Sequence, residues 1–166
     1  MNITISKATV ADLPFVENIY VDGISCGHFN LQPGLPINKM LQDWLRKNSI
    51  TRATVRKDGT QLIEEVLINF YTANIDGKFA GFLITAPETP EKIQTVEIYL
   101  LGVAKEFRKK GVATELITHA EKLAPDKANF YARCYPKSTW AISLLRKIGY
   151  RIESISKTSK VHYLRK

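Results

Sequence analysis

Cysteine is scarce in this chain, since only Cys26 and Cys134 carry thiols and they stand far apart among 166 residues. Structural zinc sites need several Cys or His residues at short spacing, and disulfide scaffolds need more cysteines than this. Neither pattern is present, so a disulfide framework is excluded and no metal is expected. We interpret both cysteines as reduced thiols that serve packing rather than chemistry.

Long apolar runs are also missing. No stretch approaches the roughly 20 apolar residues that a membrane-spanning helix needs, so no membrane partner is expected. The opening Met-Asn-Ile-Thr-Ile lacks the charged-then-apolar layout of a signal peptide. With no linker or internal repeat either, the chain is expected to form one domain over residues 1–166 and to stay in the cytoplasm.

Negative charge is outnumbered, because 24 Lys and Arg residues stand against 16 Asp and Glu. The resulting net charge of +8 and pI near 9.5 suit a polyanion such as RNA, and equally a small ligand with several phosphates. The basic residues are spread, and no arginine-rich tail or RNA-binding motif is present. A nucleic-acid partner is therefore not favoured, although charge alone does not exclude one. The sequence leaves open whether the chain forms a homodimer.

The two common glycine-rich nucleotide motifs, Gly-x-x-x-x-Gly-Lys-Ser/Thr and Gly-x-Gly-x-x-Gly, are absent. Instead, Arg108-Lys109-Lys110-Gly111-Val112-Ala113 follows an apolar run and opens an amphipathic helix predicted over 112–123. The apolar stripe of that helix is Val112, Leu116, Ile117, Ala120 and Leu123. First-turn amides of a helix bind anions, and glycine lets a phosphate approach the backbone closely. The turn therefore predicts a phosphate site, and the alternative is a solvated basic turn before an ordinary helix.

The remaining apolar pattern predicts alternating strands and helices. Strands are expected near residues 3–5, 66–75, 78–86, 93–103, 128–135, 150–156 and 161–164. Besides the helix at 112–123, three more helices are expected. The first contains Leu13, Val16 and Tyr20, and the second contains Met40, Leu41, Trp44 and Leu45. The third carries Trp140, Ala141, Leu144, Leu145 and Ile148 on one face. Residues 49–62 stay open between an irregular loop and an extra hairpin. A β-α-β step among antiparallel hairpins implies an α/β (α+β) fold, with a mixed, mostly antiparallel central sheet of about seven strands and helices on both faces.

With this element order, the Arg-x-x-Gly-x-Ala turn resembles the pyrophosphate signature Gln/Arg-x-x-Gly-x-Gly/Ala of the GNAT N-acetyltransferase superfamily. Val103 stands five residues before Arg108, as the valine that ends the preceding strand does in members of that family. A second segment, residues 138–150, is similar to the family pattern Asn-x-x-Ala-x-x-Leu-Tyr-x-Lys-x-Gly-Phe. The resemblance implies the acyl-CoA N-acyltransferase fold, with acetyl-CoA as co-substrate and no metal.

The resemblance also implies how the donor is held. Backbone groups of Leu101 and Val103 would pair with the pantetheine arm, the amides of residues 109–113 would hold the pyrophosphate, and Arg108 would shape the turn. Ser138 replaces the family's asparagine and keeps a hydroxyl for coenzyme contact or for capping the helix. The implied coenzyme-binding residues are Leu101, Val103, Arg108, Lys109, Lys110, Gly111, Val112, Ala113 and Ser138.

The chemistry rests on other positions. Glu97 lies eleven residues before Arg108, where histone-type members carry a catalytic glutamate, so it is the candidate general base. The alternative is a sheet residue that faces solvent or pairs with a lysine. Leu145 stands where many family members have a tyrosine that protonates the departing thiolate. Ser138, Tyr135 and bound water are the candidate acids, and the alternative is that the thiolate leaves without one. The amide of Val103 is the candidate oxyanion donor, with a bulge expected at Gly102.

Histidines and aromatic residues complete the expectations. His28 stays open between the acceptor pocket and the surface, His119 is expected to be solvated, and His162 to be structural. The aromatic residues expected in the core are Phe29, Trp44, Phe70 and Tyr71.

Together these features predict an N-acetyltransferase in which a primary amine attacks acetyl-CoA directly within a ternary complex. The amine, whether on a small molecule, a peptide or protein N-terminus or a lysine, is not specified by the sequence. The alternatives are a non-catalytic acyl-CoA-binding module and an RNA-associated protein, including one that acetylates aminoacyl-tRNA.

Overall fold

The computed structural model describes residues 2–30, 34–55 and 58–166. The strands are β1 (Ile3–Lys7), β2 (Ser49–Val55), β3 (Gln61–Leu67), β4 (Asn69–Ile75), β5 (Lys78–Pro87), β6 (Thr95–Val103), β7 (Asn129–Cys134), β8 (Arg151–Ile155) and β9 (His162–Arg165). The helices are α1 (Leu13–Ser25), α2 (Ile37–Lys47), α3 (Val112–Leu123) and α4 (Thr139–Lys147), with short 3₁₀ turns η1 (Val10–Asp12) and η2 (Lys105–Phe107).

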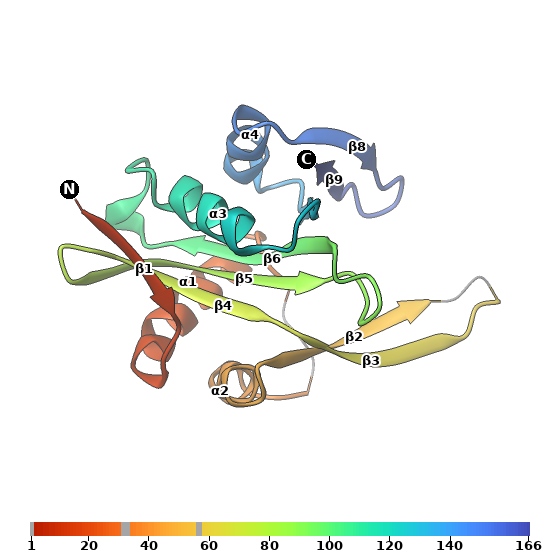
Figure 1. The fold of residues 1–166 in the computed structure, drawn as a ribbon, viewed down its shortest axis with the longest axis horizontal. Helices are drawn as coiled ribbons and strands as arrows, with labels where there is room; N and C mark the ends of the chain where they lie inside the picture. The colour runs from red at the N-terminus through yellow and green to blue at the C-terminus, as the bar shows by residue number, and fades with distance from the viewer. Residues whose placement is uncertain (1, 31–33, 56–57) are drawn as a thin grey trace.

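Seven of these strands form one sheet in the order β1-β4-β5-β6-β7-β9-β8. Neighbouring strands are antiparallel except for β6 and β7, which are parallel because α3 connects them. Helices α3 and α4 cover one face of the sheet, and α1 and α2 cover the other (Figure 1). The predicted mixed, mostly antiparallel sheet with helices on both faces is confirmed.

The stretch at 49–62 belongs to a separate two-stranded sheet, the hairpin of β2 and β3; residues 56–57 of that stretch lie outside the described part. The single strand expected over 66–75 is wrong, since β3 ends at Leu67 and β4 begins at Asn69. Ile68, between them, is buried, and its amide donates to the carbonyl of Asn48 at 2.9 Å. This contact fixes the point at which the hairpin departs from the main sheet.

Helix α3 has the predicted bounds, but the helix faces differ from the expectation at three places. Leu123 is 62% exposed because it is the last helical residue, beyond the turns that pack on the sheet. Trp140 is 68% exposed in the first turn of α4, where the Lys109 ammonium lies 4.9 Å from its ring centroid. His119 is half-buried, with its ring 5.1 Å from that of Tyr71, rather than solvated.

The core has two parts, one on each face of the sheet. Trp44, Phe70 and Tyr71 are buried as expected, whereas Phe29 is half-buried and stacks on Tyr20 with centroids 5.3 Å apart. The two cysteines are free thiols, with Cys26 exposed and Cys134 buried. Among the described helices, none combines the length and the apolar character needed to cross a membrane.

Candidate active site

Strands β6 and β7 run side by side for only part of their length. Their parallel register begins at Thr95 opposite Asn129 and ends at Ile98 opposite Ala132, whereas β6 continues to Val103. Within the described sheet, residues 100–103 of β6 therefore have a strand neighbour on the β5 side and none on the β7 side. The two strands splay apart from this point, which leaves β6 with an open edge.

The backbone of this open edge points toward the splay. The amide of Ala104 donates to the carbonyl of Ala80 at 2.9 Å, which makes the pair Val103–Gly81 a non-hydrogen-bonded pair of the antiparallel ladder. Because the ladder repeats every two residues, the same holds for Leu101. The N–H and C=O groups of Leu101 and Val103 are thus directed away from β5, to the side on which an extended ligand could pair with them.

A bulge bends β6 where the splay begins. The register with β5 shifts by one residue, and the extra residue is Tyr99. The bulge expected at Gly102 is therefore wrong, since Gly102 pairs regularly with Phe82. Glycine is needed at position 102 for a different reason. A Cβ there would lie 2.5 Å from Cγ2 of Ile19, so the lack of a side chain lets α1 approach the sheet closely.

The open edge leads directly into the turn before α3. Arg108 is extended, and Lys109 and Gly111 both adopt left-handed conformations, with φ of +63° and +84°. At Gly111 an added Cβ would meet no atom within 4 Å, so glycine is needed for the conformation and the space beside it is open. The first-turn amides of α3 have no intrahelical acceptors at this end. The turn therefore has the backbone features of an anion site and fits a pyrophosphate.

Arg108 ties this turn to the neighbouring elements. Its Nε donates to the carbonyl of Val103 at 3.2 Å, and its Nη2 lies 3.4 Å from Oδ2 of Asp22 on α1. Lys105 lies 2.7 Å from the other oxygen of the same carboxylate. The hydrogen bond from Lys105, with the positive charges of Lys105 and Arg108, lowers the pKa of Asp22. Arg108 and Lys105 thus share one carboxylate, so this contact keeps a net positive charge beside the turn.

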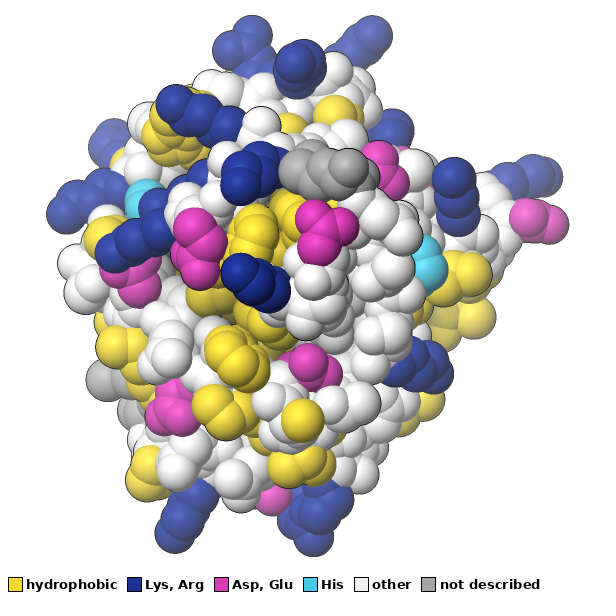
Figure 2. All heavy atoms as spheres, turned by 90° about the vertical axis from the view of Figure 1, so that its left-hand side faces the viewer, with side chains coloured by type: hydrophobic (Ala, Val, Ile, Leu, Met, Phe, Trp, Pro, Cys, Tyr) yellow, Lys and Arg dark blue, Asp and Glu magenta, His cyan; other side chains and the backbone are white. Residues whose placement is uncertain are grey.

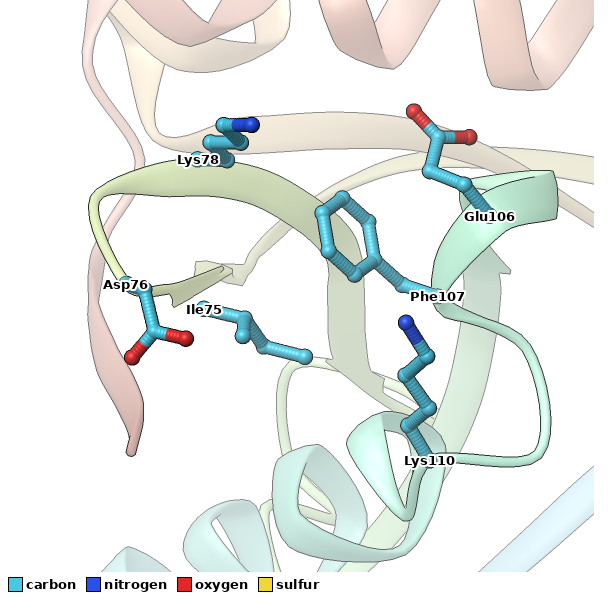
Figure 3. Close-up of a pocket in the computed structure, with 6 residues that line it drawn as sticks. All are labelled: Ile75, Asp76, Lys78, Glu106, Phe107 and Lys110. Atoms are coloured by element: carbon cyan, nitrogen blue, oxygen red, sulfur yellow. The ribbon is translucent and has the colours of Figure 1, made fainter. Parts of the chain in front are cut away.

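The side chains of the other two cationic residues in the turn, Lys109 and Lys110, point in different directions. The Lys109 ammonium lies over Trp140 of α4, whereas the Lys110 ammonium lies 5.2 Å from the ring centroid of Phe107. Figure 3 shows Lys110 and Phe107 pointing into a surface hollow of about 580 Å³. Its lining residues are Ile75, Asp76, Lys78, Glu106, Phe107 and Lys110. The structure thus separates three side chains that are adjacent in sequence.

A second hollow, of about 850 Å³, lies between α1 and the turn and includes Asp22 and Arg108. Figure 2 shows this end of the molecule, where basic and acidic side chains are interspersed around a strip of apolar ones and no single basic patch forms. Neither hollow is lined by Glu97, by Ser138 or by a residue of β7, and both include residues at the turn between β4 and β5. Across the described residues, no three His, Cys, Asp or Glu side chains come together in a way that would hold a metal ion.

Ser138 lies at the start of α4 and is 8% exposed. Its side chain does not cap the helix, so that alternative is wrong. The hydroxyl instead lies 3.2 Å from Nδ1 of His28, in the segment that follows α1. His28 is therefore not an isolated surface residue, and the contact joins elements that cover opposite faces of the sheet. Leu145, in the helix that Ser138 opens, is buried in the core and has no polar atom to offer.

Glu97 is almost fully buried, with 1% exposure, and is surrounded by donors. Nε of Arg133 lies 2.6 Å from Oε1, Nη2 of Arg52 donates to Oε2, and the hydroxyl of Tyr131 donates to Oε2 at 3.2 Å. Glu97 is therefore a paired sheet residue whose cationic partners are arginines, neither solvent-facing nor bound to lysine.

The partners of Glu97 are held in their donating forms. Burial, and then the charge of Glu97, raises the pKa of Tyr131, so its hydroxyl keeps its proton at neutral pH. Burial lowers the pKa of Arg133, but the adjacent Glu97 carboxylate outweighs this and the pKa lies above its usual value. Both groups therefore donate to Glu97 throughout the neutral range.

Three residues of this site were not singled out from the sequence: Arg52, Tyr131 and Arg133. In β7 the buried Phe130, Ala132 and Cys134 alternate with Tyr131 and Arg133, and this period of two could have marked a polar face. Arg52 has no comparable signal, because the sequence of residues 49–62 does not distinguish a loop from a hairpin.

Solved structures share this fold. The GCN5-related N-acetyltransferase from Kribbella flavida superposes with a TM-score of 0.73 at 17% identity, covering 99% of this chain and 96% of that one. The ribosomal-protein-alanine N-acetyltransferase from Brucella melitensis gives 0.69 at 21% identity, covering 98% of each chain. The PaiA N-acetyltransferase from Thermoplasma acidophilum, solved with coenzyme A, gives 0.65 at 18% identity, covering 100% and 99%. At these identities the likeness shows the fold alone.

Comparison with curated proteins yields no significant match. Residues 38–150 match the model of the acetyltransferase (GNAT) family, a span that contains the β6–β7 splay, the turn at Gly111 and the segment that begins at Ser138. That span is more than half of the chain. The chain therefore belongs to the GNAT acetyltransferase family, and acetyl-CoA is its acetyl donor.

Proposed function

We propose that this chain transfers the acetyl group of acetyl-CoA to a primary amine that attacks directly within a ternary complex. The observation that carries the proposal is the continuity of the open edge of β6 with the turn at Gly111. An unpaired strand edge suits an extended arm, and a helix N-terminus suits a pyrophosphate. Followed from the turn back along β6, this path ends beside Glu97, where the thioester would lie.

The names of the similar structures support a nitrogen acceptor. All three are N-acetyltransferases, and the Thermoplasma acidophilum protein was solved with coenzyme A. From them we carry over only the class of acceptor atom, because their own substrates need not be those of a chain about one-fifth identical or less.

In this proposal the donor is held mainly by backbone groups. Leu101 and Val103 pair with the pantetheine arm, and the amides from Lys109 to Ala113 hold the pyrophosphate. Arg108 shapes the turn from its contacts with Val103 and Asp22. Lys109 is the cation that faces α4, so it adds more charge to the donor than Lys110 does.

The attacking amine must be neutral, since an ammonium with a pKa of about 10.4 is nearly all protonated at neutral pH. Glu97 is the base that we propose, under one condition. Glu97 is almost fully buried behind three donors, so an arginine or Tyr131 must move before the amine can reach a carboxylate lone pair. The same contacts support a second role, in which Glu97 positions the arginines and the amine loses its proton to water.

Two further groups serve the acyl transfer. The N–H of Val103 lies on the open edge but six residues along β6 from Glu97, so for a thioester beside Glu97 the nearer open-edge amide, that of Leu101, is our candidate donor to the oxyanion. Ser138, backed by His28, is the hydroxyl that we propose for protonating the departing thiolate, because Leu145 cannot do so. Which of the two side chains donates in their hydrogen bond depends on the imidazole tautomer.

The test is release of free thiol from acetyl-CoA across small amines, N-terminal and lysine peptides and aminoacyl-tRNA, with calorimetric titration of acetyl-CoA alongside. We expect binding together with amine-dependent thiol release and a product heavier by one acetyl group. Coenzyme binding without turnover on any acceptor would contradict the proposal and favour a non-catalytic binding module. Retention of RNA without coenzyme binding would favour the RNA-associated alternative.

A further inference from the structure

The Glu97 cluster carries more positive than negative charge. Arg52 and Arg133 share one carboxylate, so one positive charge is left over. Arg165, on the neighbouring strand β9, lies 5.7 Å from the ring of Tyr131 but is matched by Glu153 at 3.2 Å. The surplus positive charge therefore belongs to Arg52 and Arg133, and it lies at the point where β6 and β7 separate.

The guanidinium of Arg52 is used by contacts within the protein. Its side chain is 13% exposed, Nη1 donates to the hydroxyl of Tyr131 at 3.3 Å, Nη2 donates to Glu97, and the guanidinium lies 5.4 Å over the ring of Tyr99. Its Nε is buried and has no hydrogen-bond partner in the described part of the chain. Arg52 thus supplies charge behind Glu97, with little surface left for a ligand.

Arg133 differs from Arg52 because its guanidinium is held by Glu97 at Nε, whereas its two terminal nitrogens are not bound within the described part of the chain. Its side chain is 45% exposed, and among the described residues its guanidinium forms a hydrogen bond only from Nε, to Glu97. The two terminal nitrogens remain available, and a guanidinium presents such N–H groups as a planar fork that matches a carboxylate or a phosphate. Glu97 fixes the plane of that fork in advance, which lowers the entropy lost on binding.

The position of Arg133 links this fork to the reaction. Arg133 follows Ala132, the last residue of β7 that pairs with β6, so it stands at the start of the splay. It alternates with Ala132 and Cys134, whose side chains pack under α3 and α4, and so it lies on the face covered by α1 and α2. This is the face on which Glu97 would meet the amine.

We propose that Arg133 binds an oxyanion of the acceptor, so that the acceptor is an amine that also carries a carboxylate or a phosphate. The inference rests on the proposed function and names the substrate class of the same site. Arg52 provides the second positive charge, and Glu97 is the positioning residue for both arginines. The surplus charge also disfavours polycationic acceptors, since like charges are brought together at the site.

The test compares amines that differ only in the anion. The amidated dipeptides Ala-Glu and Ala-Gln form the carboxylate arm, and phosphoethanolamine against ethanolamine forms the phosphate arm. We expect kcat/KM for thiol release to be about 10- to 100-fold higher for the anionic member of at least one arm. Arg133→Gln should abolish that ratio and Arg133→Lys should keep part of it, with the Kd for acetyl-CoA unchanged in both.

Arg165→Gln is the matched control, because this arginine lies on the next strand with comparable exposure and its own carboxylate partner; it should retain the wild-type ratio. Equal use of anionic and neutral amines, or a ratio that survives Arg133→Gln, would overturn the inference. If no amine is turned over, the proposed function fails, and titration of the coenzyme-A complex with the same amines still tests Arg133. Tighter binding of the anionic amines that Arg133→Gln removes would support the anion site, and its absence would refute it.

Discussion

The two sides of the β6–β7 splay are built in different ways. The proposed donor side consists of backbone groups that follow one another in the chain, from Leu101 through the turn to the first residues of α3. The proposed acceptor side consists of side chains from β2, β6 and β7, and the partners of Glu97 stand 34 to 45 positions away from it. A site made of consecutive backbone is encoded locally, whereas a site made of distant side chains exists only after the sheet has formed.

The largest predicted effect is on the donor side. Gly111→Glu adds a side chain at φ +84° and a negative charge at a helix N-terminus, so it should weaken acetyl-CoA binding by at least about 100-fold. Calorimetric titration measures the loss. Gly59→Glu is the control, since Gly59 has the same φ and the same open surroundings but lies in the turn of the β2–β3 hairpin. Unchanged affinity in Gly111→Glu would remove the pyrophosphate from this turn.

On the acceptor side, Glu97→Gln should leave acetyl-CoA affinity within about 2-fold while it lowers turnover. Because the largely buried Arg52 and the half-exposed Arg133 lose their counter-ion, the free energy of unfolding should fall by about 3 kcal/mol, the lower end for a broken buried pair, as measured by urea denaturation. Glu153→Gln, which breaks an exposed pair, should change stability by no more than about 1 kcal/mol.

The pH profile of Glu97→Gln separates the two roles of the carboxylate. If Glu97 is the base, kcat falls and its pH dependence changes shape. If Glu97 only positions the arginines, the shape is kept and KM for the acceptor rises. Full activity with an unchanged profile and unchanged KM would refute both roles.

A smaller effect on turnover is expected from Ser138 and His28. Ser138→Ala should lower kcat by about 3- to 10-fold, in line with the loss of one hydrogen-bonding hydroxyl. If His28 acts through Ser138, the double variant His28→Ala/Ser138→Ala should be little worse than Ser138→Ala alone. Independent, multiplying effects in single-turnover assays would show that the 3.2 Å contact between them has no role in the reaction.

The smallest effect concerns the contribution of Tyr150, which contacts α3, to the stability of the protein at high pH. Tyr150 donates to Glu121 of α3 at 2.9 Å, and burial, then this hydrogen bond, raises the pKa of Tyr150. An unfolded tyrosine ionises near pH 10, so above that pH the native state holds a proton that the unfolded state has released. Stability from this group is full below about pH 10 and is lost as pH rises further, by up to about 1.4 kcal/mol per pH unit.

Tyr150→Phe should therefore reduce the slope of stability against pH between pH 10 and 11 without a comparable change in slope near pH 8. Urea unfolding at these pH values measures it. An identical slope in the wild type and the variant would mean that Tyr150 titrates alike in the folded and unfolded states.

The sequence predicts best where structure is local. The stripe on α3 and the Gly111 turn follow from spacing within one segment, and the structure has the turn and the stripe as far as Ala120. Trp140 was misplaced because periodicity cannot tell that the first turn of α4 extends past the core. The bulge at Tyr99 arises from a register shift against β5, and no residue of β6 signals it alone.

Glu97 shows the same limit within the site. Its distance from Arg108 identified the position, but not its surroundings, since Arg52 reaches it from a hairpin whose existence the sequence left open. The departure of Leu145 from the family pattern was readable, whereas the His28–Ser138 contact across 110 positions was not.

The most direct test of the account is a crystal structure of the protein with coenzyme A. We expect the pyrophosphate to accept hydrogen bonds from amides of residues 109–113, the pantetheine arm to pair with Leu101 and Val103, and the thiol to end beside Glu97 and Arg133. Coenzyme A bound instead in the hollow between Lys78 and Lys110, with the edge of β6 left unpaired, would contradict it.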